Sequence, residues 1–117
     1  MEFSIIIPTL NNFEYLKFCI ESIKKNSKFN HEIIPHVNIG SDATVNYLKK
    51  ENITFTLTDY NAGICRGMNL AAKKSTKDYI LYAHDDFYFC PEWDVTLENE
   101  VISIGHDNFY LSGTMMN

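Results

Sequence analysis

Short apolar or alternating runs alternate with segments of helical periodicity along the whole chain. The runs predict five strands, at residues 3–7, 32–37, 53–58, 78–83 and 108–113. Proline follows the first run and interrupts the second, at positions 8 and 35. The intervening segments predict helices, from Asn11 or Asn12 (as the cap) to about Lys25, from Asp42 (as the cap) through Leu48, from about Ile64 to Lys74, and from Pro91 to near Gly105.

This alternation of strands and helices predicts an α/β fold with a parallel or mostly parallel sheet and helices on both faces. A chain of 117 residues fits a single domain, 1–117. In such sheets, ligands bind beyond the carboxyl ends of the strands, where the strand order reverses. The polar segments that follow each predicted strand are therefore the candidates for a site.

Composition narrows the class of protein. At 45% hydrophobic and 14% aromatic residues the chain can fill a core, which excludes a disordered segment. The three cysteines, Cys19, Cys65 and Cys90, are odd in number and far apart, which argues against a disulfide framework or a zinc ribbon. We interpret them as small buried hydrophobes. No apolar run reaches membrane-span length and no basic leader precedes the first strand, so we expect a cytoplasmic protein.

The charge is distributed unevenly. The net charge of −5 disfavours a nucleic-acid partner. Residues 1–77 carry all ten Lys and Arg side chains and seven acids, whereas residues 78–117 carry eight acids and no Lys or Arg. The acidic part can be a solvated face, or it can hold a cation while the basic part faces an anion.

The sharpest local feature is His84-Asp85-Asp86, directly after the fourth predicted strand. Oxygen ligands of this kind suit Mg²⁺ or Mn²⁺, which bind through a few carboxylates plus substrate phosphates. His84 can ligate Mn²⁺ or orient the acidic pair. The alternative is a surface turn, in which Asp is common because of its local hydrogen bonds.

Three further polar segments follow predicted strands, at 8–11, 38–42 and 59–63. Gly63 precedes a predicted helix whose N-terminal amides can receive an anion. Arg66 and Asn69 share one face of that helix, and Gly67 allows a backbone or a ligand to come close. An ordinary loop with a solvated arginine is the alternative.

The remaining chemistry-bearing residues have structural interpretations. Trp93 and the aromatic residues around it can form core packing, or Trp93 can face a sugar. We interpret the acids of the last predicted helix as a solvated face. They are Glu92, Asp94, Glu98 and Glu100.

Taken in order, these segments resemble the inverting family 2 glycosyltransferases. The residues that carry the resemblance are Ser4 to Asn12 with the helix after it, Asn61-Ala62-Gly63 with Asn69, and Asp78 to Asp86, the last resembling the strand that ends in the family's DxD motif. The resemblance runs through essentially the whole chain. It implies a GT-A fold, a Rossmann-like sheet that binds a nucleotide-diphospho-sugar and a divalent cation.

The resemblance also implies a role for each site residue. Thr9, Asn11 and the turn at Asn38 would lie beside the nucleoside, and Arg66 near the base or phosphates. Gly63 and Asn69 would also bind the nucleotide-sugar. Asp86 would bind Mn²⁺ or Mg²⁺, with Asp85 near the ribose or the metal's waters and His84 at the first position of the motif. The donor would be linked to UDP. The acceptor, a saccharide or a lipid-linked molecule, would favour a peripheral position at the inner face of a membrane.

Three departures from the family pattern keep alternatives open. Asn38 or Val37 stands where the family has an aspartate, His84 replaces the first acid of the DxD motif, and the chain ends after the fifth predicted strand. No catalytic base is identified, so the chain is expected to be truncated before the acceptor-binding half and to expose a sheet edge for self-association. A non-catalytic nucleotide-binding or partner-docking module is the alternative. A phosphoacceptor regulator or nucleotide hydrolase has only the acidic pair in its favour.

Overall fold

A computed structural model describes residues 1–113 of the protein. Strands and helices alternate throughout it, which confirms the predicted α/β class. The elements are β1 (Phe3–Leu10), α1 (Phe13–Asn26), β2 (Glu32–Asn38), α2 (Thr44–Lys50), β3 (Thr56–Thr58), α3 (Gly63–Ala72), β4 (Tyr79–Tyr82) and α4 (Trp93–Ile104).

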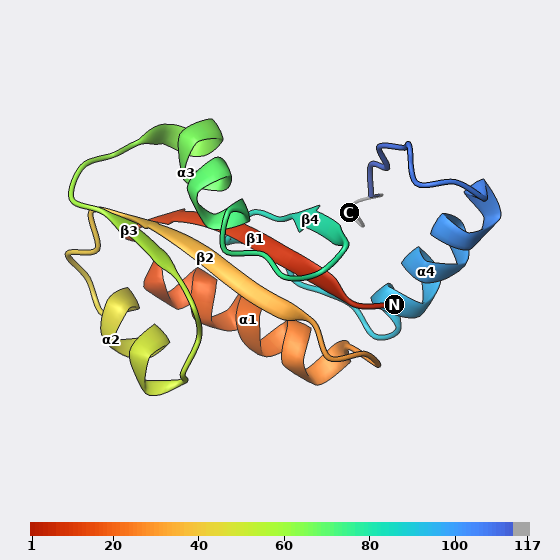
Figure 1. The fold of residues 1–117 in the computed structure, drawn as a ribbon. Helices are drawn as coiled ribbons and strands as arrows, with labels where there is room; N and C mark the ends of the chain where they lie inside the picture. The colour runs from red at the N-terminus through yellow and green to blue at the C-terminus, as the bar shows by residue number, and fades with distance from the viewer. Residues whose placement is uncertain (114–117) are drawn as a thin grey trace.

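The described sheet has the order β3-β2-β1-β4, and all three strand pairs are parallel (Figure 1). From β1 the chain builds the sheet toward β3 on one side, and then returns to place β4 on the other side of β1. The strand order therefore reverses between β1 and β4. In doubly wound sheets, this is the point beyond which ligands bind.

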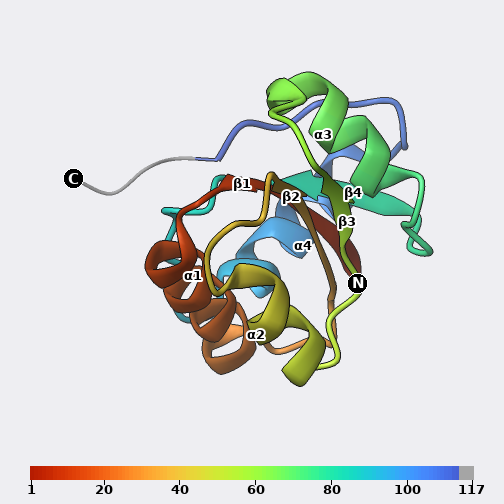
Figure 2. The same ribbon diagram turned by 90° about the vertical axis from the view of Figure 1, so that its left-hand side faces the viewer.

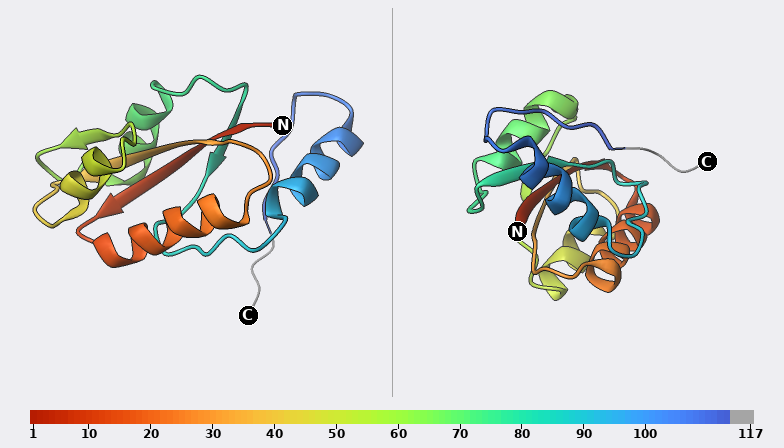
Figure 3. Two further views of the ribbon diagram at one scale, coloured as in Figure 1. Left: turned by 90° about the horizontal axis from the view of Figure 1, so that it is seen from below. Right: turned by 90° about the vertical axis from the view of Figure 1, so that its right-hand side faces the viewer.

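Helices cover both faces of the sheet, as predicted. α1 and α2 lie on one face and α3 on the other (Figures 1 and 2). The larger core lies under α1 and includes Ile5, Ile7, Leu16 and Ile20, all fully buried. Burial of each such side chain stabilises the fold by about 1.5–3 kcal/mol. α4 lies near the amino end of β1 (Figure 3).

The face under α3 has a smaller core and a polar continuation. Ile6, Ile34 and Ala71 form a buried cluster there. Because side chains two apart along a strand lie on the same face, His36 and Asn38 continue the row that begins at Ile34. This face of β2 therefore changes from apolar to polar toward the carboxyl ends of the strands.

Two prolines lie inside strands without interrupting them. Pro8 extends β1 beyond the predicted end at residue 7, and Pro35 lies within β2. Pairing of β1 with β4 ends at Ile6 and Tyr82, where the Ile6 carbonyl accepts a bond from Ala83, so Pro8 lies past that ladder. Pro35 likewise precedes the first β2–β3 pair, His36 with Thr56. Neither missing N–H is needed by a neighbouring strand.

The prediction of a fifth strand is wrong. Residues 108–113 have no strand structure, and Tyr110 is 92% exposed. Side chains hold this segment near the start of β4: the Tyr79 hydroxyl donates to Asp107, and the Tyr79 ring stacks on Phe109 with centroids 5.9 Å apart. A strand needs backbone pairing that these side-chain contacts do not supply. The third strand is also shorter than its alternating run, because only residues 56–58 pair with β2.

None of the four helices between residues 1 and 113 has the length and apolar character needed to cross a bilayer.

Candidate functional site

Hydrogen bonds connect the loops that follow all four strands at the carboxyl edge of the sheet. Thr9 at the end of β1 bonds to Asp85 after β4, and Asn11 after β1 bonds to Ser41 after β2. Asn38 at the end of β2 bonds to the backbone of Ala62, just before α3. The sequence prediction that these segments converge on one edge is therefore confirmed.

Thr9 and Asp85 form the contact at the point where the strand order reverses. Thr9 is buried, and its hydroxyl donates to Oδ2 of Asp85 over 2.8 Å. The bond holds the Asp85 carboxylate against the end of β1 and uses the hydroxyl hydrogen of Thr9. Asp86, the next residue, is exposed. Within residues 1–113 no hydrogen bond or ion pair engages the Asp86 carboxylate.

The described residues contain no group of three or more His, Cys, Asp or Glu side chains that could hold a metal ion. Binding of a metal ion by His84, Asp85 and Asp86 therefore stays a prediction. The His84 ring instead contacts the rings of Tyr82 and Phe87, each with centroids 5.0 Å apart. The acidic pair still fits a cation that takes one or two carboxylates and completes its shell with substrate phosphates and water.

Asn38 supports the loop before α3. It is 4% exposed, and its carbonyl Oδ1 accepts the Ala62 backbone N–H over 2.9 Å. The side chain therefore has a structural partner at the position where the family pattern has an aspartate. Direct contact of Asn38 with a nucleoside stays a prediction.

The loops after β1 and β2 are tied together by two side chains. Asn11, with a φ of 46°, accepts the Ser41 hydroxyl at Oδ1 over 3.0 Å. Asp42 accepts the Phe13 N–H over 3.2 Å and the Thr44 N–H over 3.1 Å. Asp42 therefore accepts bonds in the first turns of both α1 and α2. Asn12 lies at the N-cap position of α1, as predicted, but its side chain makes no capping hydrogen bond. The sequence around α1 does not reveal the Asp42 contact, because the carboxylate comes from a different loop.

Backbone strain gathers in the same loops. Ile39 has a φ of 73°, in the left-handed region that β-branched residues avoid, and the following Gly40 has a φ of 69°. Ile39 is held in place by a bond from its N–H to the Thr58 carbonyl over 2.8 Å. A residue in such a conformation costs about 1–3 kcal/mol and is often found at a functional site.

α3 presents a cation beside this edge. The helix begins at Gly63, which has a φ of 82° and donates its N–H to Asn61. Arg66 and Asn69 are exposed in the first turns. Among the described residues no ion pair involves Arg66. The guanidinium is thus available for an anion.

Gly67 allows a close approach, as predicted, but the group that approaches is a side chain. A Cβ at this position would lie 2.6 Å from Cδ2 of His36 on β2. His36 was not among the residues singled out from the sequence. The signals that could have found it are a polar residue in an apolar strand, the Thr-x-Thr pattern of β3 and a glycine inside α3.

Several residues are placed differently from their sequence interpretations. Trp93 packs on Phe3, His31 and Phe89, near the amino end of the sheet, so the core interpretation holds. Asp94 is fully buried, which corrects its assignment to a solvated face. Of the cysteines only Cys19 is buried, and the other two are exposed.

Cys19 lies beneath the acidic pair. Its thiol donates to the His84 carbonyl over 3.7 Å. Burial, with a further contribution from the charges of Asp85 and Asp86, raises the pKa of Cys19 to about 12. The thiol is therefore protonated at neutral pH and supports the His84 loop from below.

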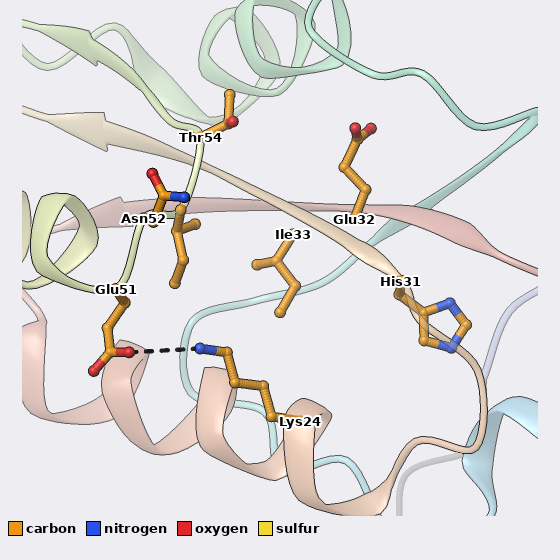
Figure 4. A pocket seen from close by; sticks show the side chains of 8 residues that line it. Lys24, His31, Glu32, Ile33, Glu51, Asn52 and Thr54 are labelled. Atoms are coloured by element: carbon orange, nitrogen blue, oxygen red, sulfur yellow. Dashed lines mark ion pairs between the residues drawn. The ribbon is translucent and has the colours of Figure 1, made fainter.

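A hollow of about 290 Å³ lies at the opposite, amino edge of the sheet (Figure 4). Lys24, Glu32 and Glu51 line it, and Lys24 pairs with Glu51 over 3.9 Å. None of the strand-end motifs contributes to this hollow, so it is separate from the candidate site.

Comparison with solved structures identifies similar folds. TarS residues 1–349 of S. aureus, solved alone, with UDP-GlcNAc and with UDP, is 25% identical, with a TM-score of 0.73 over 90% of this chain and 31–32% of TarS 1–349. The mannosyltransferase PcManGT of Pyrobaculum calidifontis, solved with GDP-Man and Mn²⁺, is 20% identical, with a TM-score of 0.68 over 84% of this chain and 30% of that protein. The chain thus spans about a third of TarS 1–349 and of PcManGT, and 20% of the longer TarS structure.

A comparison with curated proteins finds no match. The family model described as "Glycosyl transferase family 2" matches residues 4–113, which is nearly the whole chain and includes the described strands and helices except Phe3, the first residue of β1. The chain therefore belongs to glycosyl transferase family 2, and its sheet has the GT-A, Rossmann-like fold.

Proposed function

We propose that the carboxyl edge of the sheet binds a nucleotide-diphospho-sugar, linked to UDP, together with Mn²⁺ or Mg²⁺. The observation that carries the proposal is the contact between Thr9 and Asp85, which fixes a carboxylate at the point where the strand order reverses. TarS, which is similar over 90% of this chain, was solved with UDP-GlcNAc and with UDP. The same edge of this chain has the groups that such a ligand requires.

The chemistry of these groups supports the assignment. A divalent cation held by Asp86 and Asp85 would neutralise the charge of the diphosphate leaving group, and would act as a Lewis acid when that group departs. Arg66, exposed in the first turns of α3, supplies a second positive charge for the phosphates. In the protein to which this domain belongs, we propose transfer of the sugar to a saccharide or lipid-linked acceptor, in the cytoplasm or at the inner face of a membrane.

A nucleotide-binding or partner-docking module without transfer is the second candidate, and the position of α4 favours it. Asp94 is buried, and Glu98 binds the amino terminus. The acids of α4 thus lie near the amino end of β1, away from the candidate site. Release of UDP from UDP-GlcNAc in the presence of added saccharide acceptors would distinguish transfer from binding alone.

Calorimetric titration with UDP-GlcNAc tests the donor site. We expect binding with Mn²⁺ or Mg²⁺, weakened by a chelator, and a rise in Kd of about tenfold or more for Asp86→Ala. Asp78→Ala is the matched control, because it removes an exposed acid from the opposite end of β4. Absence of binding to UDP-GlcNAc and to other nucleotide-diphospho-sugars would overturn the proposal.

A further inference from the structure

His36 is a buried histidine with a partner on each ring nitrogen. It lies in β2 opposite Thr56 of β3 and is 0% exposed. Its Nδ1 lies 2.7 Å from the Thr56 hydroxyl, and its Nε2 lies 3.2 Å from the Thr58 hydroxyl. Burial lowers the pKa of His36 below its ordinary value, so the ring is neutral at pH 7. A neutral ring has one donor and one acceptor nitrogen.

The hydroxyl of Thr58 determines which nitrogen carries the hydrogen. Its Oγ1 lies 2.7 Å from the carbonyl oxygen of Tyr60, a group that can only accept. Oδ1 of Asn38, 3.4 Å from Oγ1, can also only accept. The single hydroxyl hydrogen of Thr58 is therefore donated to one of these two oxygens, of which that of Tyr60 is the nearer, and Oγ1 must accept from Nε2–H of His36. Nδ1 is then left to accept the Thr56 hydroxyl. The tautomer is fixed by the loop that follows β3.

The ring of His36 also packs directly against α3. Gly67 packs so closely on Cδ2 of His36 that a Cβ would lie at 2.6 Å. Arg66 is the residue just before this contact. The height of the helix above the sheet, and with it the position of Arg66, is set by the imidazole ring.

The loop between β3 and α3 is anchored at two points beside this contact. Thr58 holds the Tyr60 carbonyl, and Asn38, two residues along β2 from His36, holds the Ala62 N–H. Loop and helix therefore rest on one row of side chains on β2. These contacts leave the Arg66 guanidinium free.

We propose that His36 is a positioning residue for the donor site: as the Nε2–H tautomer it holds loop 59–63 through Thr58 and α3 through Gly67, and so places Arg66 at the carboxyl edge of the sheet. This inference rests on the proposed function. His36 itself touches no reacting group. Its role is to give the phosphate-binding side of the site a fixed geometry.

Two threonine variants test this chain of contacts from His36 through Thr58 to loop 59–63, which we call the relay. Thr58→Val removes the hydroxyl that connects Nε2–H to the loop, whereas Thr56→Val removes the hydroxyl on the other nitrogen. Each loses one hydrogen bond to His36, and Thr58→Val also loses the bond to the Tyr60 carbonyl, so we expect the larger loss of stability in Thr58→Val. Only Thr58→Val should speed hydrogen exchange of the Ala62 amide and raise the Kd for UDP-GlcNAc with Mn²⁺, each about tenfold. His36→Asn should have a larger effect than His36→Gln, since only glutamine places an N–H near the Nε2 position.

The outcomes separate this inference from the proposed function. Equal exchange and equal Kd in the two threonine variants, or an Nδ1–H tautomer in the ¹⁵N spectrum of His36, would overturn the positioning role. Faster exchange with unchanged Kd would show that the relay orders the loop without serving the donor. If the unaltered protein binds no nucleotide-sugar, the proposed function fails, and the donor-positioning role fails with it. The Ala62 amide still reports whether the relay orders the loop.

Discussion

Acidic side chains occur at both ends of the parallel sheet, and their surroundings differ. Near the amino end, Asp94 is fully buried, and its Oδ2 accepts from the N–H groups of Lys28 and Phe29 and from Nε2 of His31, at 2.8–2.9 Å. At the carboxyl end, Asp85 accepts one bond, from Thr9, and Asp86 is exposed. A carboxylate with several protein donors contributes to folding, whereas one with few is available to a ligand.

The donors around Asp94 also determine the direction of its pKa shift. Burial alone would raise the pKa of Asp94, but the hydrogen bonds from Phe29, His31 and Lys28 outweigh it, and the pKa lies below its usual range. A depressed pKa in the folded state means that the ionised form stabilises the fold. Asp94 therefore joins α4 to the segment between α1 and β2.

The largest expected effect is at the amino end. Asp94→Ala leaves two backbone N–H groups and the His31 ring without their acceptor, so we expect a loss of about 3 kcal/mol in the free energy of unfolding. Urea denaturation measures it. Glu100→Ala, an exposed acid on the same helix, is the control and should change stability by less than about 0.5 kcal/mol. Equal losses in both variants would contradict the comparison.

The acid dependence of stability tests the same residue. In the unfolded chain Asp94 titrates near the ordinary value of about 3.9, and in the folded protein its pKa is lower. Its contribution is therefore present above that ordinary value and is lost as the pH falls through the folded pKa. Asp94→Ala should lose less stability than the unaltered protein when denaturation is repeated at successively lower pH.

The next largest effect is expected at the contact between Gly67 of α3 and the His36 ring. In an exposed helix Gly→Ala stabilises by about 1 kcal/mol, but at Gly67 the new Cβ meets the His36 ring. We expect Gly67→Ala to destabilise by about 1–3 kcal/mol, as overpacking does. Thermal unfolding measures this. Adding His36→Val should recover part of the loss in a double-mutant cycle, and simple additivity would contradict the contact.

The smallest effect is a difference in thiol reactivity. Cys19 is buried with a pKa of about 12, whereas Cys65 and Cys90 are exposed. Because the thiolate is the reactive form, iodoacetamide at pH 8 should label Cys65 and Cys90 in the folded protein, and Cys19 only after unfolding. Peptide mass analysis locates the label. Labelling of Cys19 at the rate of the other two would show that the His84 loop opens readily.

The elements themselves could be predicted from the sequence because they depend on local periodicity. The α1 helix and the first two strands are found close to their predicted positions. Residues 108–113 were wrongly predicted as a strand, because an alternating pattern shows that a segment can pair but not that a neighbour is present. The shortened third strand, with its single partner β2, has the same explanation.

The site could be predicted as a location but not as a set of contacts. Parallel topology alone brings Thr9, Asn38 and Asp85 to one edge. Which of them bond to one another depends on distances between loops far apart in the sequence, as with Asp42 at the start of α1. Asp94 was misplaced for a related reason: its three main donors lie 63–66 residues away along the chain.

Trp93 is the single tryptophan of the chain, and its indole N–H donates to Ser27 while its ring packs on Phe89 and His31. The tryptophan fluorescence of the protein therefore comes from one fluorophore at the amino end. Its emission should follow unfolding of that end closely and should change little when a ligand occupies the carboxyl edge. An optical assay for donor binding thus needs a second reporter, and Cys65 in the first turn of α3 offers an attachment point for one.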